Sequence, residues 1–129
     1  QELRIYANAS LVRGTDVNEA TPLPKIPPLR GLLGIRFEQP NGNYWLDFSG
    51  RLVNEQDRVA DNELKTSGYN IYDISSGINV GEIFNLKYPL FITCNVKNIF
   101  DKSYRDHLSY VTWWDAPGRN IIVGLRSNF

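Results

Sequence analysis

Alternation between apolar and polar residues, with a period of two, constrains this chain more than any other feature of its sequence. Successive side chains of a β-strand point to opposite faces, so a segment with this period can present one apolar face and one polar face. The pattern is clear from Leu3 to Leu11 and recurs along the chain. The predicted strands lie within residues 3–11, 33–37, 44–52, 72–81, 90–97 and 121–129. The sequence therefore predicts an all-β chain of about six antiparallel strands.

The segments between these strands alternate in length. Short connections are expected at Gln39–Asn43, where an Asn-Gly pair favours a tight turn, and near Glu82–Leu86. Long loops are expected at Thr15–Arg30, Asn54–Gly68 and Asp101–Arg119. Strands near ten residues, joined alternately by short turns and long loops, are typical of an up-and-down transmembrane barrel with its long loops outside the cell. We therefore expect the last strand to descend towards the periplasm.

The overall composition excludes several classes of protein. Lys plus Arg and Asp plus Glu both total 14, so no basic excess indicates a nucleic-acid partner. The longest apolar stretches, such as Tyr88–Ile92, are far shorter than the ~18 residues that a membrane helix needs. The single cysteine, Cys94, excludes an intrachain disulfide. The chain contains no methionine, and we interpret Gln1 as a cut through a longer protein or as a processed end.

The polar faces of the predicted strands are too polar for the core of a soluble protein. Asp47 and Arg51 share a face with Trp45, and Asn95 and Lys97 share a face of another strand. A water-filled or plug-filled barrel lumen tolerates such groups, and the almost purely apolar opposite face suits hydrocarbon. A soluble antiparallel sheet with one wet face shows the same alternation, so a soluble binding module is the alternative. The rhythm of the connections favours the membrane barrel.

Three segments carry a more specific resemblance. Leu23–Pro28 reads LPKIPP, Val96–Tyr104 reads VKNIFDKSY, and Pro117–Arg119 reads PGR before an alternating strand that ends at Phe129. They resemble the LPxIPP loop, the VxNLFDKxY segment and the terminal PGRxxxxxLxxxF strand of TonB-dependent outer-membrane receptors. The three segments have the order of that family, and the resemblance spans essentially all 129 residues. One departure is Ser127, where the family's terminal stripe usually continues with a larger apolar residue.

The resemblance implies a place for the chain in a larger machine. Residues 1–129 would be the C-terminal part of a 22-stranded barrel, without its N-terminal plug domain. About six strands are too few to close a membrane barrel, which needs at least ~8, so the rest of the receptor and the lipid bilayer are expected partners. The resemblance also implies the outer membrane of a Gram-negative bacterium, and active uptake driven by the TonB complex through the missing N-terminal region. The ligand would be a scarce compound such as a ferric siderophore, haem or cobalamin. We predict no enzymatic activity and no cofactor.

Two groups of residues follow from the resemblance. The apolar stripe of the last strand is expected both to face lipid and to be recognised by the barrel-assembly machinery, although facing lipid alone would explain it: Ile121, Val123, Leu125 and Phe129. The residues of the two C-terminal motifs are expected to be structural, because they recur across receptors whose ligands differ: Asn98, Phe100, Asp101, Tyr104, Pro117, Gly118 and Arg119.

The last long loop carries the candidate ligand-binding residues. Exposed aromatic side chains on such a loop can stack on a ligand, and a histidine can bind a metal: His107, Tyr110, Trp113 and Trp114. The alternative is that the tryptophans belong to an interfacial aromatic girdle or pack the loop against its neighbours. A single histidine is a poor metal site, so we predict none. Asp106, His107 and Ser109 also allow an outer-membrane enzyme, but neighbours within one loop seldom form a catalytic triad.

Overall fold

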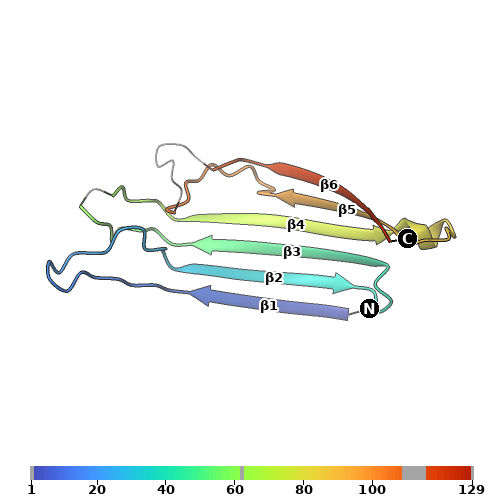
Figure 1. Cartoon of the computed structure of the whole chain (residues 1–129), viewed down its shortest axis with the longest axis horizontal. Helices are drawn as coiled ribbons and strands as arrows, with labels where there is room; N and C mark the ends of the chain where they lie inside the picture. Colours follow the sequence, from blue (N-terminus) through green and yellow to red (C-terminus); the bar gives the residue numbers. More distant parts are fainter. Residues whose placement is uncertain (1, 62, 109–115, 129) are drawn as a thin grey trace.

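Six antiparallel strands form one sheet in the computed structural model, which describes residues 2–61, 63–108 and 116–128 (Figure 1). Each strand pairs with its neighbours in sequence, in the order β1-β2-β3-β4-β5-β6. The elements are β1 (Glu2–Ser10), β2 (Arg30–Glu38), β3 (Tyr44–Val53), β4 (Tyr69–Asn79), α1 (Val80–Ile83), β5 (Leu90–Lys97) and β6 (Asn120–Ser127). This arrangement confirms the predicted all-β, up-and-down architecture. The described residues contain no helix that is long and apolar enough to cross a membrane.

The long and the short connections lie at opposite ends of the sheet. The described parts of the loops 11–29, 54–68 and 98–119 lie at one end, which we call the long-loop end. The two shorter connections lie at the other, the short-turn end (Figure 1). In the β2–β3 turn, Gly42 has a φ of 74° and donates its N–H to Gln39 O over 2.8 Å. An L residue rarely adopts this φ, so the Asn-Gly pair explains why the chain reverses here.

The β4–β5 connection differs from the prediction. It spans residues 80–89 and contains the helical turn α1, so Val80 and Gly81, which the alternation placed in a strand, are helical. Hydrogen bonds from Phe84 N–H to Val80 O (3.0 Å) and from Leu86 N–H to Gly81 O (2.8 Å) close the turn. The Asn79 side chain also accepts a hydrogen bond from Leu90 N–H (3.3 Å) across the connection. The alternation of residues continues past the end of β4, but hydrogen bonds within the connection make this segment helical.

The register of the strands collects the apolar residues on one face. Residues directly opposite each other in antiparallel strands point to the same side, so the pairs build continuous rows across the sheet. One such row crosses all six strands and consists of Ile5, Ile35, Phe48, Ile74, Val96 and Ile121. The adjacent row, one residue away, points to the opposite side and consists of Arg4, Arg36, Asp47, Ser75, Asn95 and Ile122. We call these two sides the apolar face and the polar face.

The apolar face is open along the whole sheet. Its side chains include Ile5, which is 68% exposed, and Leu125, which is 71% exposed. Among the described residues the buried hydrophobic side chains are Val53, Tyr69 and Ile71. These three lie on the polar face near the long-loop end, where Tyr104 of the last loop packs against them. The small core therefore lies beneath the loops, and it leaves the apolar face uncovered.

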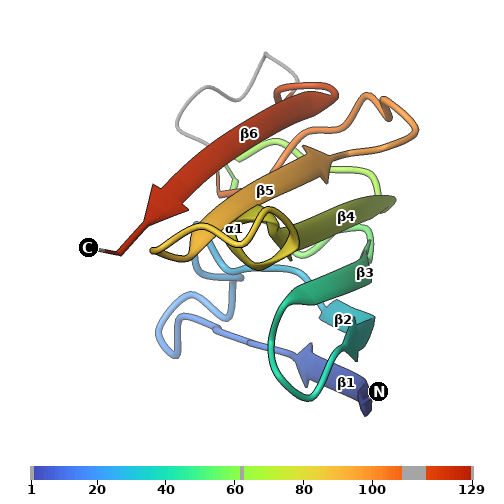
Figure 2. The same cartoon turned by 90° about the vertical axis from the view of Figure 1, so that its right-hand side faces the viewer.

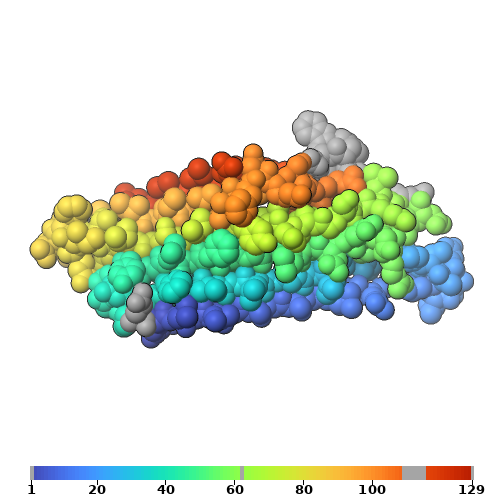
Figure 3. Space-filling model, turned by 180° about the vertical axis from the view of Figure 1, so that it is seen from behind, coloured from blue at the N-terminus to red at the C-terminus, as the bar shows by residue number. Residues whose placement is uncertain are grey.

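The sheet is curved across its strands. Viewed along the strands, β1 to β6 follow an arc (Figure 2). From one side, the strands form a continuous surface with the N-terminal strand at one edge and the C-terminal strand at the other (Figure 3). Both edge strands, β1 and β6, pair on one side only within the described chain. Such edges are unstable unless further strands or other groups cover them.

Candidate functional site

Paired polar groups cover the centre of the polar face. The Tyr6 hydroxyl donates a hydrogen bond to Asp47 Oδ1 over 2.8 Å, between β1 and β3. The Arg36 guanidinium lies 4.3 Å from the centroid of the Trp45 ring, and its Nε lies 3.1 Å from Glu38 Oε2. Arg and Trp in this arrangement attract each other through the ring quadrupole. The polar face is thus ordered by its own side chains, as a wall beside water or other polar groups requires.

Two glycines make room for the aromatic rings on this face. A Cβ at Gly34 would lie 2.1 Å from the Tyr6 ring, and a Cβ at Gly77 would lie 2.5 Å from Trp45 Nε1. Each ring therefore lies directly over the glycine of the neighbouring strand, where no side chain other than hydrogen fits. The close approach of each ring to its glycine comes from the register of the strands, which the alternation alone does not specify.

The turn that follows β5 is fixed by residues of the VKNIFDKSY segment. Asn98 is 3% exposed and has a φ of 53°. Its backbone N–H donates a hydrogen bond to Asp73 Oδ1 over 2.8 Å. Its side-chain amide donates to Lys102 O and accepts from Lys102 N–H, both over 2.8 Å. Asparagine tolerates positive φ better than most residues, which explains this residue type at this position.

A second set of contacts joins this turn to the start of the last strand. Arg119 donates its backbone N–H to Asp101 Oδ1 (2.7 Å) and its Nε to Ile99 O (2.9 Å). A Cβ at Gly118 would lie 2.5 Å from Asp101 Oδ1, so the backbone passes close to that carboxylate. The exposed Pro117 precedes it. These contacts support the structural role predicted for the motif residues, which stays a prediction.

The two aromatic residues of that motif point to different sides. Tyr104 packs on Tyr69 with ring centroids 4.5 Å apart, within the small core. Phe100 is 71% exposed, and its ring forms a T-shaped pair with Tyr72, with the ring centroids 5.6 Å apart. Tyr72 in turn stacks on Phe48. Tyr72 and Phe48 lie on the apolar face, so an aromatic cluster occupies this face towards the long-loop end.

The three long loops meet at one carboxylate. Glu63 of the β3–β4 loop accepts hydrogen bonds from the backbone N–H of Lys25 (2.9 Å), in the first loop, and of Ala60 (3.4 Å), in its own loop. His107 of the last loop lies with its Nε2 3.1 Å from Glu63 Oε1, and its Nδ1 lies 3.1 Å from Thr66 Oγ1. The side chains of His107 and Glu63 are only 2% and 9% exposed. We call these contacts the loop junction.

Further hydrogen bonds tie the loops together in pairs. The first and second loops are joined by Gln56 Nε2, which donates to Ile26 O over 2.6 Å. The second and third are joined by Arg105, which donates to Lys65 O over 2.6 Å. Charged and amide side chains thus connect all three loops, which form one layer across the long-loop end of the sheet.

The loop junction bears on the predicted ligand-binding residues. Both ring nitrogens of His107 face other residues of the chain, and the side chain is almost fully buried. Asp106 pairs with Arg30 (3.1 Å), so Asp106 and His107 have different partners. Tyr110, Trp113, Trp114 and Ser109 lie outside the described residues, and the ligand-binding role of this group stays a prediction. No three His, Cys, Asp or Glu side chains gather as a metal site within the described part of the chain.

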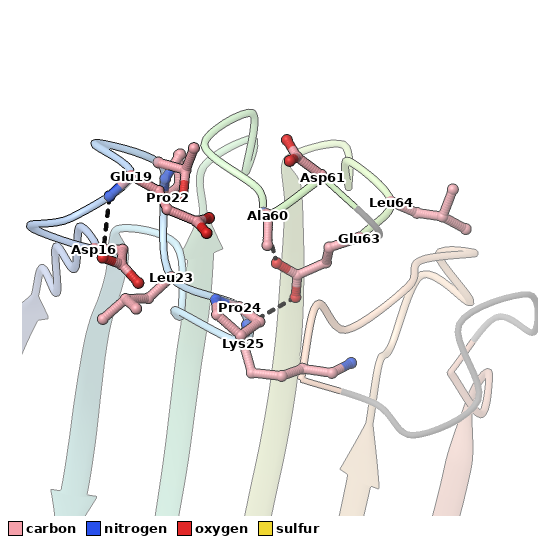
Figure 4. Close-up of a pocket in the computed structure, with 11 residues that line it drawn as sticks. Asp16, Glu19, Pro22, Leu23, Pro24, Lys25, Ala60, Asp61, Glu63 and Leu64 are labelled. Carbon is pink, nitrogen blue, oxygen red and sulfur yellow. Dashed lines mark hydrogen bonds between the residues drawn. The ribbon is translucent and has the colours of Figure 1, made fainter.

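An opening of about 550 Å³ lies between the first and second loops (Figure 4). Four carboxylates line it, from Asp16, Glu19, Asp61 and Glu63. Two of them are engaged within the chain: Asp16 Oδ1 accepts from the backbone N–H of Glu19 at 3.3 Å, and Glu63 belongs to the loop junction (Figure 4). The opening therefore has an acidic rim, and two of its four carboxylates also stabilise the loops through hydrogen bonds.

The last strand presents its predicted stripe on the apolar face. Ile121, Val123 and Leu125 are 62%, 70% and 71% exposed, and Phe129 lies outside the described residues. Ser127, the departure from the family pattern, donates its hydroxyl to Pro89 O over 3.0 Å. Recognition of the stripe by the barrel-assembly machinery stays a prediction.

Comparison with known proteins establishes the fold. No protein-family model and no curated protein sequence matches this chain. The solved structure of the copper transporter OprC is similar to 98% of this chain, with a TM-score of 0.83 and 22% sequence identity. The chain spans only 21% of the length of that protein. The six strands of this chain therefore have the same fold as a section of OprC that makes up about one fifth of its length. At 22% identity this similarity shows the fold alone.

Proposed function

We propose that this chain is a section of the wall of a transport barrel in the outer membrane of a Gram-negative bacterium. The observation that carries the proposal is the open apolar face, in which one row of hydrophobic side chains crosses all six strands while the adjacent row is mainly polar. Hydrocarbon stabilises such a face, and a lumen stabilises the polar side. Further strands would pair with β1 and β6 and close the barrel.

The finer part of the proposal concerns the kind of transporter. The three sequence segments that resemble TonB-dependent receptors support a C-terminal barrel segment whose plug and remaining strands belong to the rest of the receptor. Uptake would then be driven by the TonB complex, and the barrel-assembly machinery would recognise the last strand. The ligand class expected from the resemblance, a ferric siderophore, haem, cobalamin or a similar scarce compound, is part of this proposal.

A soluble binding module fits the structure less well. A soluble sheet needs a second layer over its apolar face, because large exposed apolar surfaces promote association. Within the described residues the buried hydrophobic side chains number three, and they lie on the opposite, polar face. The long loops pack at the end of the sheet and leave the apolar face open, which favours lipid as its neighbour.

Location and orientation test the proposal together. An epitope is inserted into the full-length protein either in the loop 54–68 or in the β2–β3 turn 39–43, which lie at opposite ends of the sheet. We expect both proteins in the outer-membrane fraction, and we expect antibody to bind intact cells only when the epitope is in the loop. An antibody against the natural loop should detect a protein several times larger than 14.8 kDa. Recovery of the protein in the soluble fraction without detergent would contradict the membrane barrel.

A further inference from the structure

A second opening lies on the polar face near the long-loop end. It has a volume of about 250 Å³ and is shared by β1, β2, β3, the start of β4 and the last loop. Its polar side chains come from Asn8, Ser10, Arg30, Arg51, Tyr69 and Asp106. The opening thus has two guanidinium groups and one carboxylate among its lining, in contrast to the acidic opening between the loops.

Each of the two arginines of this opening has a buried N–H donor that lacks a hydrogen-bond acceptor. Among the described residues, four buried side-chain nitrogen or oxygen atoms lack a hydrogen-bond partner, and two of them are the Nε atoms of Arg30 and Arg51. Leaving a buried donor unsatisfied is unfavourable, and native structures normally provide an acceptor. Both residues line the same opening, which indicates a missing acceptor at this place.

Each guanidinium group lies beside a carboxylate, but neither carboxylate accepts a hydrogen bond from the Nε–H group. Arg30 donates a hydrogen bond to Asp106 through its terminal nitrogen, over 3.1 Å. Arg51 Nε lies 3.3 Å from Asp73 Oδ2, but the two atoms are not aligned for a hydrogen bond. Each guanidinium has five N–H donors in a rigid fork, so one carboxylate neighbour leaves donors for a second acceptor.

The positions of the two arginines suit a shared acceptor. Arg30 is paired with Val53 in the register, and Arg51 lies two residues before Val53 on the same face. Such diagonal neighbours are roughly 7–8 Å apart at the backbone, within reach of two long side chains that converge on one group. Planar guanidinium groups match the oxygen atoms of carboxylate and phosphate groups. The hydroxyl groups of Ser10 and Tyr69 add donors to the lining.

We propose that Arg30 and Arg51 form an oxyanion-binding site on the polar face, which takes a carboxylate or phosphate group of a free ligand inside the barrel. This inference rests on the proposed function, because the polar face lines a lumen only if the chain is barrel wall. A carboxylate from another part of the same protein has the same chemistry as the ligand's group. The experiment therefore has to separate these two sources.

Titration of the purified full-length protein with succinate and with inorganic phosphate tests the site. The probes are added to the protein in detergent micelles at constant ionic strength, with chloride as the reference anion, because screening alone changes weak electrostatic binding. We expect saturable binding of at least one probe. We expect Arg51→Gln to weaken it about tenfold or more, the loss expected for one charged hydrogen-bond donor, and the double variant Arg30→Gln/Arg51→Gln to abolish it.

Arg36→Gln is the matched control, since Arg36 lies on the same face but covers Trp45 and does not line the opening. Its affinity should stay within about twofold of the wild type. Arg51→Lys keeps the charge but lacks the planar fork, so it should bind with intermediate affinity. Heat-dependent electrophoretic mobility, measured on every variant, reports whether the barrel is folded, and binding is compared between folded proteins.

Three results would overturn the site. They are unchanged binding by the folded double variant, an equal loss in Arg36→Gln, and no saturable binding by the wild type. If the wild type binds neither probe while the double variant is less thermally stable than Arg36→Gln, the acceptor is a carboxylate of the protein itself. None of these results changes the location of the protein. Failure of the fractionation test would contradict the proposed function instead, so the two failures are distinguishable.

Discussion

Placing a lysine at the centre of the apolar face tests the assignment of the two faces most directly. Ile35 lies in the fully apolar row, between Ile5 and Phe48, and is 38% exposed. It is one residue from Gly34, the middle of the nine-residue strand β2. A strand tilted by roughly 40° advances about 2.6 Å per residue across the membrane. Ile35 therefore lies within about 3 Å of the middle of the strand, where the hydrocarbon is deepest.

The expected cost of Ile35→Lys follows from this depth. A lysine on the lipid face of a membrane barrel costs about 2–4 kcal/mol at the midplane and little near the interfaces. We expect the free energy of unfolding to fall by about 3 kcal/mol, which is a factor of roughly 150 in the folding equilibrium. Ser49→Lys is the matched control, because Ser49 is paired with Gly34 at the same depth but points to the polar face, opposite Asp73. Its expected cost is about 1 kcal/mol, because the substitution removes only the side-chain hydrogen bond between Ser49 and Tyr6.

The assay is guanidinium unfolding of the full-length protein in lipid vesicles, followed by tryptophan fluorescence. Ile35→Leu serves as a second control, since it changes the shape of the side chain and keeps it apolar. A difference between Ile35→Lys and Ser49→Lys of less than about 0.5 kcal/mol would refute the argument that the apolar face contacts hydrocarbon. A larger loss for Ser49→Lys would indicate that the two faces are assigned the wrong way round.

Three further predictions concern particular contacts. Gly77→Ala should lower the free energy of unfolding by about 1–3 kcal/mol and shift the fluorescence of Trp45, because the added methyl group would lie 2.5 Å from its ring nitrogen. Asn98→Ala should lower the stability by about 2 kcal/mol in thermal or chemical unfolding, because it removes two hydrogen bonds to Lys102 at a buried site. A spin label on Cys94 should be more accessible to dissolved oxygen than to a water-soluble nickel complex, because its row neighbours place it on the apolar face.

Each of these predictions has an internal comparison. Gly31→Ala introduces a methyl group 3.9 Å from its nearest neighbour, so an effect as large as that of Gly77→Ala would contradict the steric argument. Asn70 is an exposed asparagine at the start of β4, and Asn70→Ala should change the stability by less than about 0.5 kcal/mol. Preferential access of the nickel complex to the label would place Cys94 in water.

The strands could be predicted from the sequence because each strand has its own alternation of apolar and polar residues. Ile5, Ile35 and Phe48 each belong to a local alternation, and pairing of consecutive strands then brings them into one row. The helical turn α1 could not be predicted in this way, because Val80 continues the alternation of Ile74 and Ile78 beyond the last ladder pair, Asn79 with Phe91. Hydrogen bonds within the connection decide its shape, and periodicity contains no information about them.

The contacts of the candidate sites were harder to foresee, since they join residues that are distant in sequence. The sequence drew attention to His107 because of its residue type and the aromatic residues near it. Its partner Glu63 lies 44 positions earlier, in a polar loop with many similar residues. Arg30 and Arg51 come together only through the β2–β3 register, which a single sequence does not specify to the residue. Only the structure shows that both arginines line the same opening and that each has a buried Nε without a hydrogen-bond partner.

The loop junction also limits how the surface of this protein can change. Because Glu63 contacts residues of all three long loops, replacement of one loop removes an anchor from the other two. A graft of a foreign second loop would need to carry both Glu63 and Thr66 to hold His107. Engineering of new surface properties, such as antigenicity, is therefore expected to succeed when the three loops are exchanged as one unit, and to fail when they are exchanged singly.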